Sequence, residues 1–350
     1  MIRFIKKIFP LLFVLALLAV GWYYQDCLKE KYCNAKGVYY IYKGDVAYSS
    51  DNMAKTLEFY KKGLELFPKH YEAWFNLGNI YAVHEDYYTE EDAYEHALEA
   101  NPKFVLARMN LGIVYSEDLG LFDEAIKQFD TITEIKLFKL WIPFVFSNVK
   151  SIKANRGLAH FNKGVAYRQK ALYLPIEKQH LAYRYLSESI KSYTEALKFL
   201  KSHHDTYYNR GVVHHLRGEY KLAGQDYCKA IEIQPMNFEG QYNLAVLLRR
   251  INRNRDSISE LQKAALLITE NPKSSEVQTT YIFNLLNEVT RRFITNEAYY
   301  TEKLGDEPVG SVSYTYVNGR IVADDDFEKA MYKNFQTCAG KGFFSSKEDN

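Results

Sequence analysis

The chain has 350 residues, with 45 Lys and Arg against 43 Asp and Glu, so that its formal net charge is only +2. A balance this even argues against nucleic acid as the main partner, because nucleic-acid-binding surfaces carry a clustered excess of basic residues. Hydrophobic residues make up 47% of the chain, and 18 Gly and 8 Pro are few, which excludes a largely disordered chain and favours packed helices.

An uncharged, apolar run covers residues 8–24, directly after the basic residues Arg3, Lys6 and Lys7. Such a run is about long enough to span a membrane, and the basic residues before it predict a cytoplasmic N-terminus. We therefore expect a membrane anchor in residues 1–25 and the bulk of the chain outside the cytoplasm, in the periplasm if the source is bacterial. A cleaved signal peptide is the alternative, because it has the same basic start and apolar core. The residues expected in the anchor are Ile8, Leu11, Leu12, Phe13, Leu15, Leu17, Leu18 and Trp22.

Two cysteines, Cys27 and Cys33, lie close together in the linker that we expect over residues 26–36. In an oxidising compartment they would be able to form a disulfide. Two unpaired thiols are the alternative, and the sequence leaves both open.

A repeat of 34 residues begins after this linker. Residues 71–81 read Tyr-Glu-Ala-Trp-Phe-Asn-Leu-Gly-Asn-Ile-Tyr, and the Asn-Leu-Gly core returns at 110–112. Further copies of the frame start near residues 37, 161, 207 and 242. Because Gly and apolar residues recur at helical spacing in each copy, we predict two helices per repeat.

This pattern resembles that of the tetratricopeptide repeat (TPR) family over residues 37–270, about two thirds of the chain. The resemblance implies an all-α superhelical solenoid of about six units with a concave groove. Glu90 departs from the pattern, which has a small residue at that position. An insertion at residues 168–190 interrupts the fourth unit.

Beyond the repeats, residues 274–303 read as an amphipathic helix that caps the array. Residues 304–350 form a tail in which Asn318-Gly319, between β-forming residues, predicts a small C-terminal β-hairpin. The apolar run 137–149 is too short to span a membrane. We expect it to fill the irregular junction between the third and fourth units, with contact to lipid or to a partner as the alternative.

Asparagine occupies the sixth position of the first helix in five repeats. Because an amide offers both a donor and an acceptor, regularly spaced Asn side chains can hold the backbone of an extended peptide. The resemblance implies an asparagine ladder of this kind; the alternative is that these amides only bond neighbouring helices. The residues predicted to contact a partner are Asn76, Asn79, Asn110, Asn162, Asn209, His215, Asn243, Arg249 and Arg250.

Basic residues near the ends of the later first helices, above all Arg249 and Arg250, predict a preference for an acidic segment of the partner. Metal binding is not expected. The pairs His203-His204 and His214-His215 are about 16 Å apart along a helix, too far to share an ion.

Neither a Gly-x-Ser-x-Gly motif, nor a phosphate-binding loop, nor a His-Glu-x-x-His motif occurs, so we expect no enzyme activity and no cofactor. The sequence predicts a membrane-tethered scaffold that binds a protein or peptide segment, and it leaves self-association open. An accessory factor for the export or modification of envelope polysaccharide or lipid is one alternative. An enzyme that uses residues 305–350 is another.

Overall fold

A computed structural model describes residues 29–135, 145–251, 253–270, 279–280, 282–290, 315–317 and 320–322. These residues are almost entirely helical. The chain divides into two compact units, Met1–Gln128 and Phe129–Asn350, and the boundary lies within one helix.

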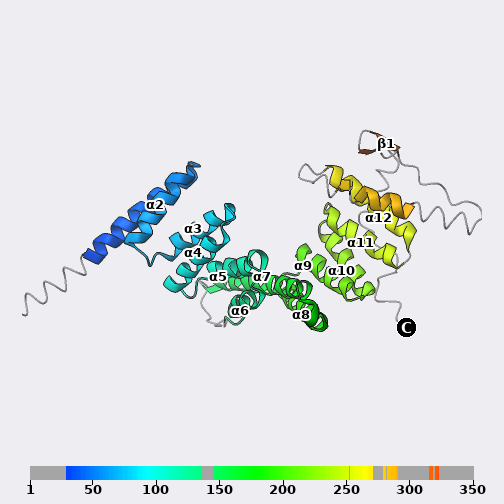
Figure 1. Ribbon diagram of the computed structural model, residues 1–350, viewed down its shortest axis with the longest axis horizontal. Coiled ribbons are helices and arrows are strands. Elements are labelled where there is room, and N and C mark those ends of the chain that lie inside the picture. Colours follow the sequence, from blue (N-terminus) through cyan, green and yellow to red (C-terminus); the bar gives the residue numbers. More distant parts are fainter. Residues whose placement is uncertain are drawn as a thin grey trace, which may run out of the picture. The chain divides into compact units, whose positions relative to one another are not determined.

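The first unit consists of consecutive helices that short turns join into pairs (Figure 1). It contains a helix over residues 29–49, α2 (Met53–Leu66), α3 (Tyr71–Val83), α4 (Tyr87–Ala100), α5 (Val105–Ile113), the π-helical turn η1 (Val114–Asp118) and most of α6 (Phe122–Thr133).

The second unit continues the same pattern. It contains α7 (Val145–Leu172), the 3₁₀ turn η2 (Ile176–Leu181), α8 (Ala182–Phe199), α9 (His204–Leu216), α10 (Tyr220–Ile233), α11 (Phe238–Arg250) and α12 (Asn254–Glu270). The end of α7, the turn η2 and the start of α8 occupy the predicted insertion at 168–190. Residues 279–280 and 282–290, within the segment expected to cap the array, are helical.

Two short strands lie where the sequence predicts a hairpin. Strand β1 (Thr315–Val317) pairs antiparallel with β2 (Arg320–Val322), with Tyr316 opposite Ile321. Two residues separate the strands in sequence.

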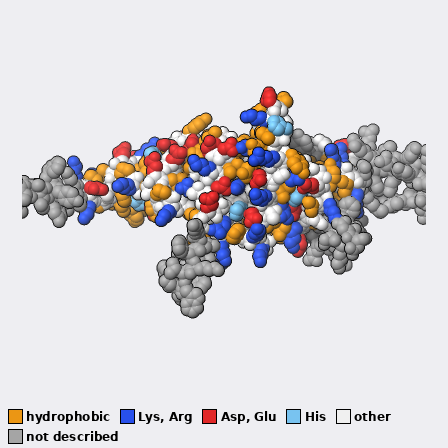
Figure 2. Space-filling view, turned by 90° about the horizontal axis from the view of Figure 1, so that it is seen from below, with side chains coloured by type: hydrophobic (Ala, Val, Ile, Leu, Met, Phe, Trp, Pro, Cys, Tyr) orange, Lys and Arg blue, Asp and Glu red, His pale blue; other side chains and the backbone are white. Residues whose placement is uncertain are grey.

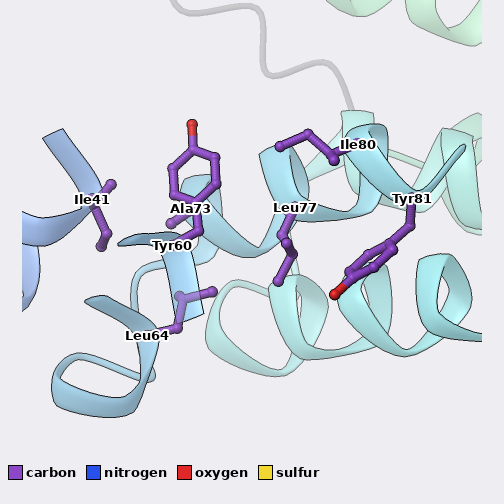
Figure 3. Packing of buried hydrophobic residues seen from close by; sticks show 7 residues of the cluster. All are labelled: Ile41, Tyr60, Leu64, Ala73, Leu77, Ile80 and Tyr81. Atoms are coloured by element: carbon purple, nitrogen blue, oxygen red, sulfur yellow. The ribbon is translucent and has the colours of Figure 1, made fainter. Parts of the chain in front are cut away.

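The core of the first unit lies between the first helix, α2 and α3. Tyr60 and Leu64 of α2 belong to one apolar cluster with Leu77 of α3, and Figure 3 shows the Tyr60 hydroxyl pointing away from Leu64. In the next pair, Gly78 of α3 allows a tyrosine of α4 to pack directly on the helix, because a Cβ at Gly78 would lie 2.5 Å from the Tyr94 ring. The repeated glycine therefore fixes where the tyrosine lies.

Apolar side chains also fill the second unit, in clusters between successive helix pairs. Tyr227, Leu244 and Leu248 join α10 to α11, and Leu261 and Leu286 join α12 to the helix over 282–290. Each pair therefore covers the apolar face of the next, as stacked repeats require.

The predicted single-pass localisation is contradicted and needs correction. Among the helices that the structure describes, none is both long and apolar enough to cross a membrane. The longest, α7, has 28 residues but carries charges along its length, including Lys153, Lys163 and Arg168. The apolar run 8–24, on which the prediction of an anchor rested, lies outside the described residues.

Two other sequence expectations fall partly or wholly outside the described residues. Cys33 is a free thiol on the first helix, and Cys27, the other cysteine of the disulfide that the sequence left open, lies outside the described part. Cys228 of α10, by contrast, is disulfide-bonded. Of the apolar run 137–149, residues 137–144 lie outside the described residues and 145–149 begin α7.

Candidate functional site

The predicted asparagines of the first unit are hydrogen-bonded to tyrosine hydroxyls. The Tyr94 hydroxyl donates to Asn79 Oδ1 at 2.8 Å, and Asn110 Nδ2 donates to the Tyr94 oxygen at 3.1 Å. Asn110 Nδ2 also reaches Asn79 Oδ1 at 3.1 Å. One buried tyrosine on α4 thus joins an asparagine from α3 to one from α5.

The preceding repeat has a related arrangement. The Tyr60 hydroxyl donates to Asp45 of the first helix at 2.5 Å, and Asn76 Nδ2 donates weakly to the same hydroxyl at 3.5 Å. Burial, together with the hydrogen bond to Asp45, raises the pKa of Tyr60 far above its usual range. The phenol therefore stays protonated and holds the asparagine amide.

Asn243 in the second unit follows the same rule with a different tyrosine. Its Nδ2 donates to the Tyr208 hydroxyl at 2.7 Å and to the Glu239 backbone carbonyl at 3.1 Å. Asn162, on α7, is half-buried.

These contacts use the nitrogen of each amide. Among the described residues, nothing donates a hydrogen bond to the Oδ1 of Asn76, Asn110 or Asn243, and all three side chains are half-buried. Since an amide carbonyl accepts hydrogen bonds well, the repeats that contain Asn76, Asn110 and Asn243 each present an oriented acceptor at a partly accessible position.

Asn209 is engaged on both sides. Its Nδ2 donates to the Asp205 carbonyl at 2.9 Å, and its Oδ1 accepts from the guanidinium of Arg168 at 2.8 Å. At this position the amide therefore bonds Arg168 of the neighbouring helix α7 and its own helix α9.

The two arginines expected to bind an acidic group have different environments. Arg249 pairs with Glu288 at 2.8 Å, which ties α11 to the helix over 282–290. Arg250 is exposed, and its Nε lies 3.4 Å from the Tyr220 hydroxyl. Burial and, to a lesser extent, the positive charge of Arg250 lower the pKa of His215.

A third arginine belongs to a fully paired network that the sequence did not indicate. Arg210 donates to both carboxylate oxygens of Asp226, at 2.7 and 2.8 Å, and both side chains are largely buried. His214 Nδ1 lies 2.5 Å from Glu219. This network joins α9 to α10 and leaves little capacity for a ligand.

In the part of the chain that the structure describes, no three His, Cys, Asp or Glu side chains gather closely enough to hold an ion. The face shown in Figure 2 interleaves acidic and basic side chains and shows no extended patch of one sign.

Sequence reasoning missed the tyrosine hydroxyls, whereas Arg168 was among the basic residues expected near the ends of the later first helices. The signal for the tyrosines is the 34-residue spacing of Tyr60 and Tyr94 and of Tyr193 and Tyr227, each packed on a glycine of the first helix. The pattern identified these as packing residues, and their hydroxyls as hydrogen-bond partners of asparagine follow only from the fold.

Comparisons with known proteins identify the repeats. Two tetratricopeptide repeat models match residues 59–92 and 204–237. A TPR repeat-containing protein of Methanocaldococcus jannaschii is 23% identical over 84% of this chain and 50% of its own length. The chain thus spans about half the length of that relative.

Two further similarities cover a smaller share of this chain. A peptide N-acetylglucosaminyltransferase of Giardia intestinalis is 35% identical over 74 residues, which are 21% of this chain and 5% of that enzyme. The crystal structure of PilW, a type IV pilus biogenesis factor, aligns with a TM-score of 0.52 at 14% identity, covering 71% of this chain and 99% of PilW. At that identity the likeness shows the fold alone. The two matched segments and the helix pairs of the described units identify tetratricopeptide repeats in this chain.

Proposed function

We propose that the chain is a protein-interaction scaffold that captures an extended peptide by its backbone. The TPR architecture supports the scaffold, since stacked helix pairs offer an extended surface for a partner. The observation that carries the proposal is the unused Oδ1 of Asn76, Asn110 and Asn243, each on an amide whose nitrogen is held by a tyrosine.

The chemistry of this arrangement suits main-chain recognition. An extended peptide presents backbone N–H groups at regular intervals, and each requires an acceptor when it is removed from water. Oriented carbonyl oxygens supply acceptors without selecting a side chain. Because the amides are already fixed, binding costs little side-chain entropy.

The test uses peptides selected from a random ten-residue display library on the complete chain. A fluorescent version of a selected peptide is titrated against wild type and against the triple variant Asn76→Ala, Asn110→Ala, Asn243→Ala. We expect the variant to bind about two- to tenfold more weakly, because a peptide held on either unit loses at least one hydrogen bond of about 0.5–1.5 kcal/mol.

The control removes an exposed ion pair on α2, through Glu58→Ala and Lys62→Ala. It should change the dissociation constant less than twofold. Equal binding by the triple variant, with its helical circular dichroism preserved, would contradict the proposal, as would failure to select any peptide.

A further inference from the structure

In the first unit, one face of α3 is covered by the helix that precedes it. Ala73, Leu77 and Ile80 lie along this face, are at most 3% exposed, and share an apolar cluster with Tyr60 and Leu64 of α2 (Figure 3). A single repeat cannot bury such a face by itself and relies on its neighbour. The covered face of α3 therefore marks where the second helix of a preceding repeat packs.

The helix over residues 29–49 leaves the corresponding face exposed. Each of the three α3 residues has a counterpart 34 residues earlier in the chain: Tyr39, Lys43 and Val46. Tyr39 is 53% exposed and Val46 is 47% exposed. Tyr32, which precedes Tyr39 by two helical turns, is 68% exposed. Exposed apolar side chains that line up on one face mark an interaction surface.

Two rows of residues recur every seven positions along this helix. Because seven residues are about two helical turns, each row stays on one side of the helix. Helices that pair side by side repeat their contacts at the same interval, so the face suits a partner helix. The two rows, which together form what we call the open face, are Tyr32, Tyr39 and Val46, and Lys29, Lys36 and Lys43.

The lysine row sets the charge that a partner must carry. Lys43 Nζ lies 4.9 Å from the centre of the Tyr39 ring and 5.4 Å from the centre of the Phe59 ring on α2, so the cation stays beside the apolar row. Lys29 and Lys36 are exposed. Within the described residues, no carboxylate lies at ion-pair distance from these three lysines. Positive charge next to apolar surface favours acidic groups on the partner.

We propose that the open face binds an amphipathic helix of a partner protein, in which glutamate or aspartate flanks an apolar row. This helix takes the place on residues 29–49 that α2 holds on α3. Tyrosine supplies a large, rigid contact area, and the lysines pair with the flanking carboxylates. The interaction goes beyond the proposed peptide capture and does not depend on it.

Two other occupants match the open face less well. A second copy of the chain would bring the same lysine row, and like charges at a contact repel each other. The apolar run 8–24 of this chain has no acidic residue, so it offers no counterion to the lysines. An acidic amphipathic helix satisfies both rows.

The test compares two synthetic libraries of stapled helical peptides, three heptads long, with varied apolar residues in one row. The flanking positions are glutamate in one library and glutamine in the other, so that the libraries differ only in charge. Peptides captured by the complete wild-type chain are quantified by mass spectrometry. We expect the glutamate library to be enriched about threefold or more over the glutamine library, because several partly exposed ion pairs contribute.

Two variants separate the roles of the rows. Lys36→Gln with Lys43→Gln should remove the enrichment and leave the capture of the glutamine library unchanged. Tyr39→Ser with Val46→Ser should lower capture of both libraries about tenfold, because the apolar anchors are lost. The matched control is Val83→Ser with Tyr88→Ser, an exposed valine and tyrosine on α3 and α4 of the same unit, and it should retain capture within twofold.

Capture of neither library, equal capture of both by wild type, or enrichment that persists in the lysine variant would overturn the proposal. So would self-association of the wild type in sedimentation that Tyr39→Ser with Val46→Ser abolishes, since a second copy would then occupy the face. The triple asparagine variant should capture the helices as well as wild type does. Failure of this site and failure of peptide capture are therefore distinguishable.

Discussion

Two arginines of the second unit lie on the first helices of successive repeats and differ in the charge of their hydrogen-bond partners. Arg210 of α9 is bonded to both oxygens of a buried aspartate, Asp226, and its charge is fully compensated within the chain. Arg168 of α7 is held by the amide of Asn209 and by no described carboxylate. The first arrangement locks two helices together, and the second leaves a charge uncompensated within the described residues.

This contrast separates a compensated charge from an uncompensated one. Both arginines are equally visible in the sequence, and only the partner that the fold brings to each distinguishes them. If the distinction is correct, substitutions at the two places will differ in the sign of their effect on stability.

The largest effect is expected at the paired site. Asp226→Ala leaves the buried Arg210 guanidinium uncompensated and should lower the free energy of unfolding by about 3–5 kcal/mol. Urea denaturation followed by circular dichroism measures it. The double variant Arg210→Met, Asp226→Leu removes both charges and should lose much less; a loss below about 1 kcal/mol for Asp226→Ala alone would show that the pair is not structural.

Glu90 extends the comparison to an unpaired acid in the first unit. Burial raises the pKa of Glu90 to about 7. The interaction with Tyr94 lowers this pKa in part, and the negative charge of Asp118 raises it. Because the folded state then binds a proton more tightly than the unfolded state, stability should fall as pH rises from about 4.5 to about 7.

Glu90→Gln should remove this dependence. Between pH 5 and pH 8, wild type is expected to lose about 1–3 kcal/mol relative to the variant. Melting curves at the two pH values measure the difference, and parallel pH profiles for the two proteins would contradict the assignment.

At Arg168 we expect a gain in stability. Arg168→Met replaces an uncompensated half-buried cation by an apolar side chain of similar length, which should raise the free energy of unfolding by about 1 kcal/mol. Arg210→Met is the matched substitution and should lower it. A loss at both positions, measured in the same urea series, would show that Arg168 is structural as well.

The smallest effect concerns the tyrosine hydroxyls. Tyr94→Phe removes the group that joins Asn79 to Asn110 and should cost about 0.5–1.5 kcal/mol. Tyr227→Phe is the control, because that hydroxyl makes only a weak contact with His215 at 3.5 Å. Equal melting temperatures for the two variants would mean that the tyrosine does not orient the asparagines.

The repeat spacing predicted much of the fold because it records packing. Gly78 and Tyr94 recur in the frame since one backbone must approach one ring, and that need is local to a helix pair. The π-helical turn η1 was not predictable from the repeat. Glu85 and Gly120 both have a left-handed backbone, but they are 35 residues apart, one more than the repeat length. The wider turn η1 accommodates this extra residue.

The site was less accessible to sequence reasoning. The frame indicated the position of each asparagine, but which atom of the amide is occupied depends on the register between adjacent helices. Arg249 and Glu288 are 39 residues apart in sequence, and no repeat pattern specifies that they interact. The missing partner of Arg168 follows only from the surroundings of its side chain.

The most direct test of peptide capture by the asparagine carbonyls is a backbone N-methyl scan of one selected peptide. Each peptide N–H is replaced in turn by N-methyl, and the dissociation constants are measured with wild type and with Asn110→Ala. We predict one position at which methylation weakens binding to wild type about tenfold and leaves binding to the variant unchanged, as expected for two coupled groups. Losses of equal size in both proteins at every position would contradict the account.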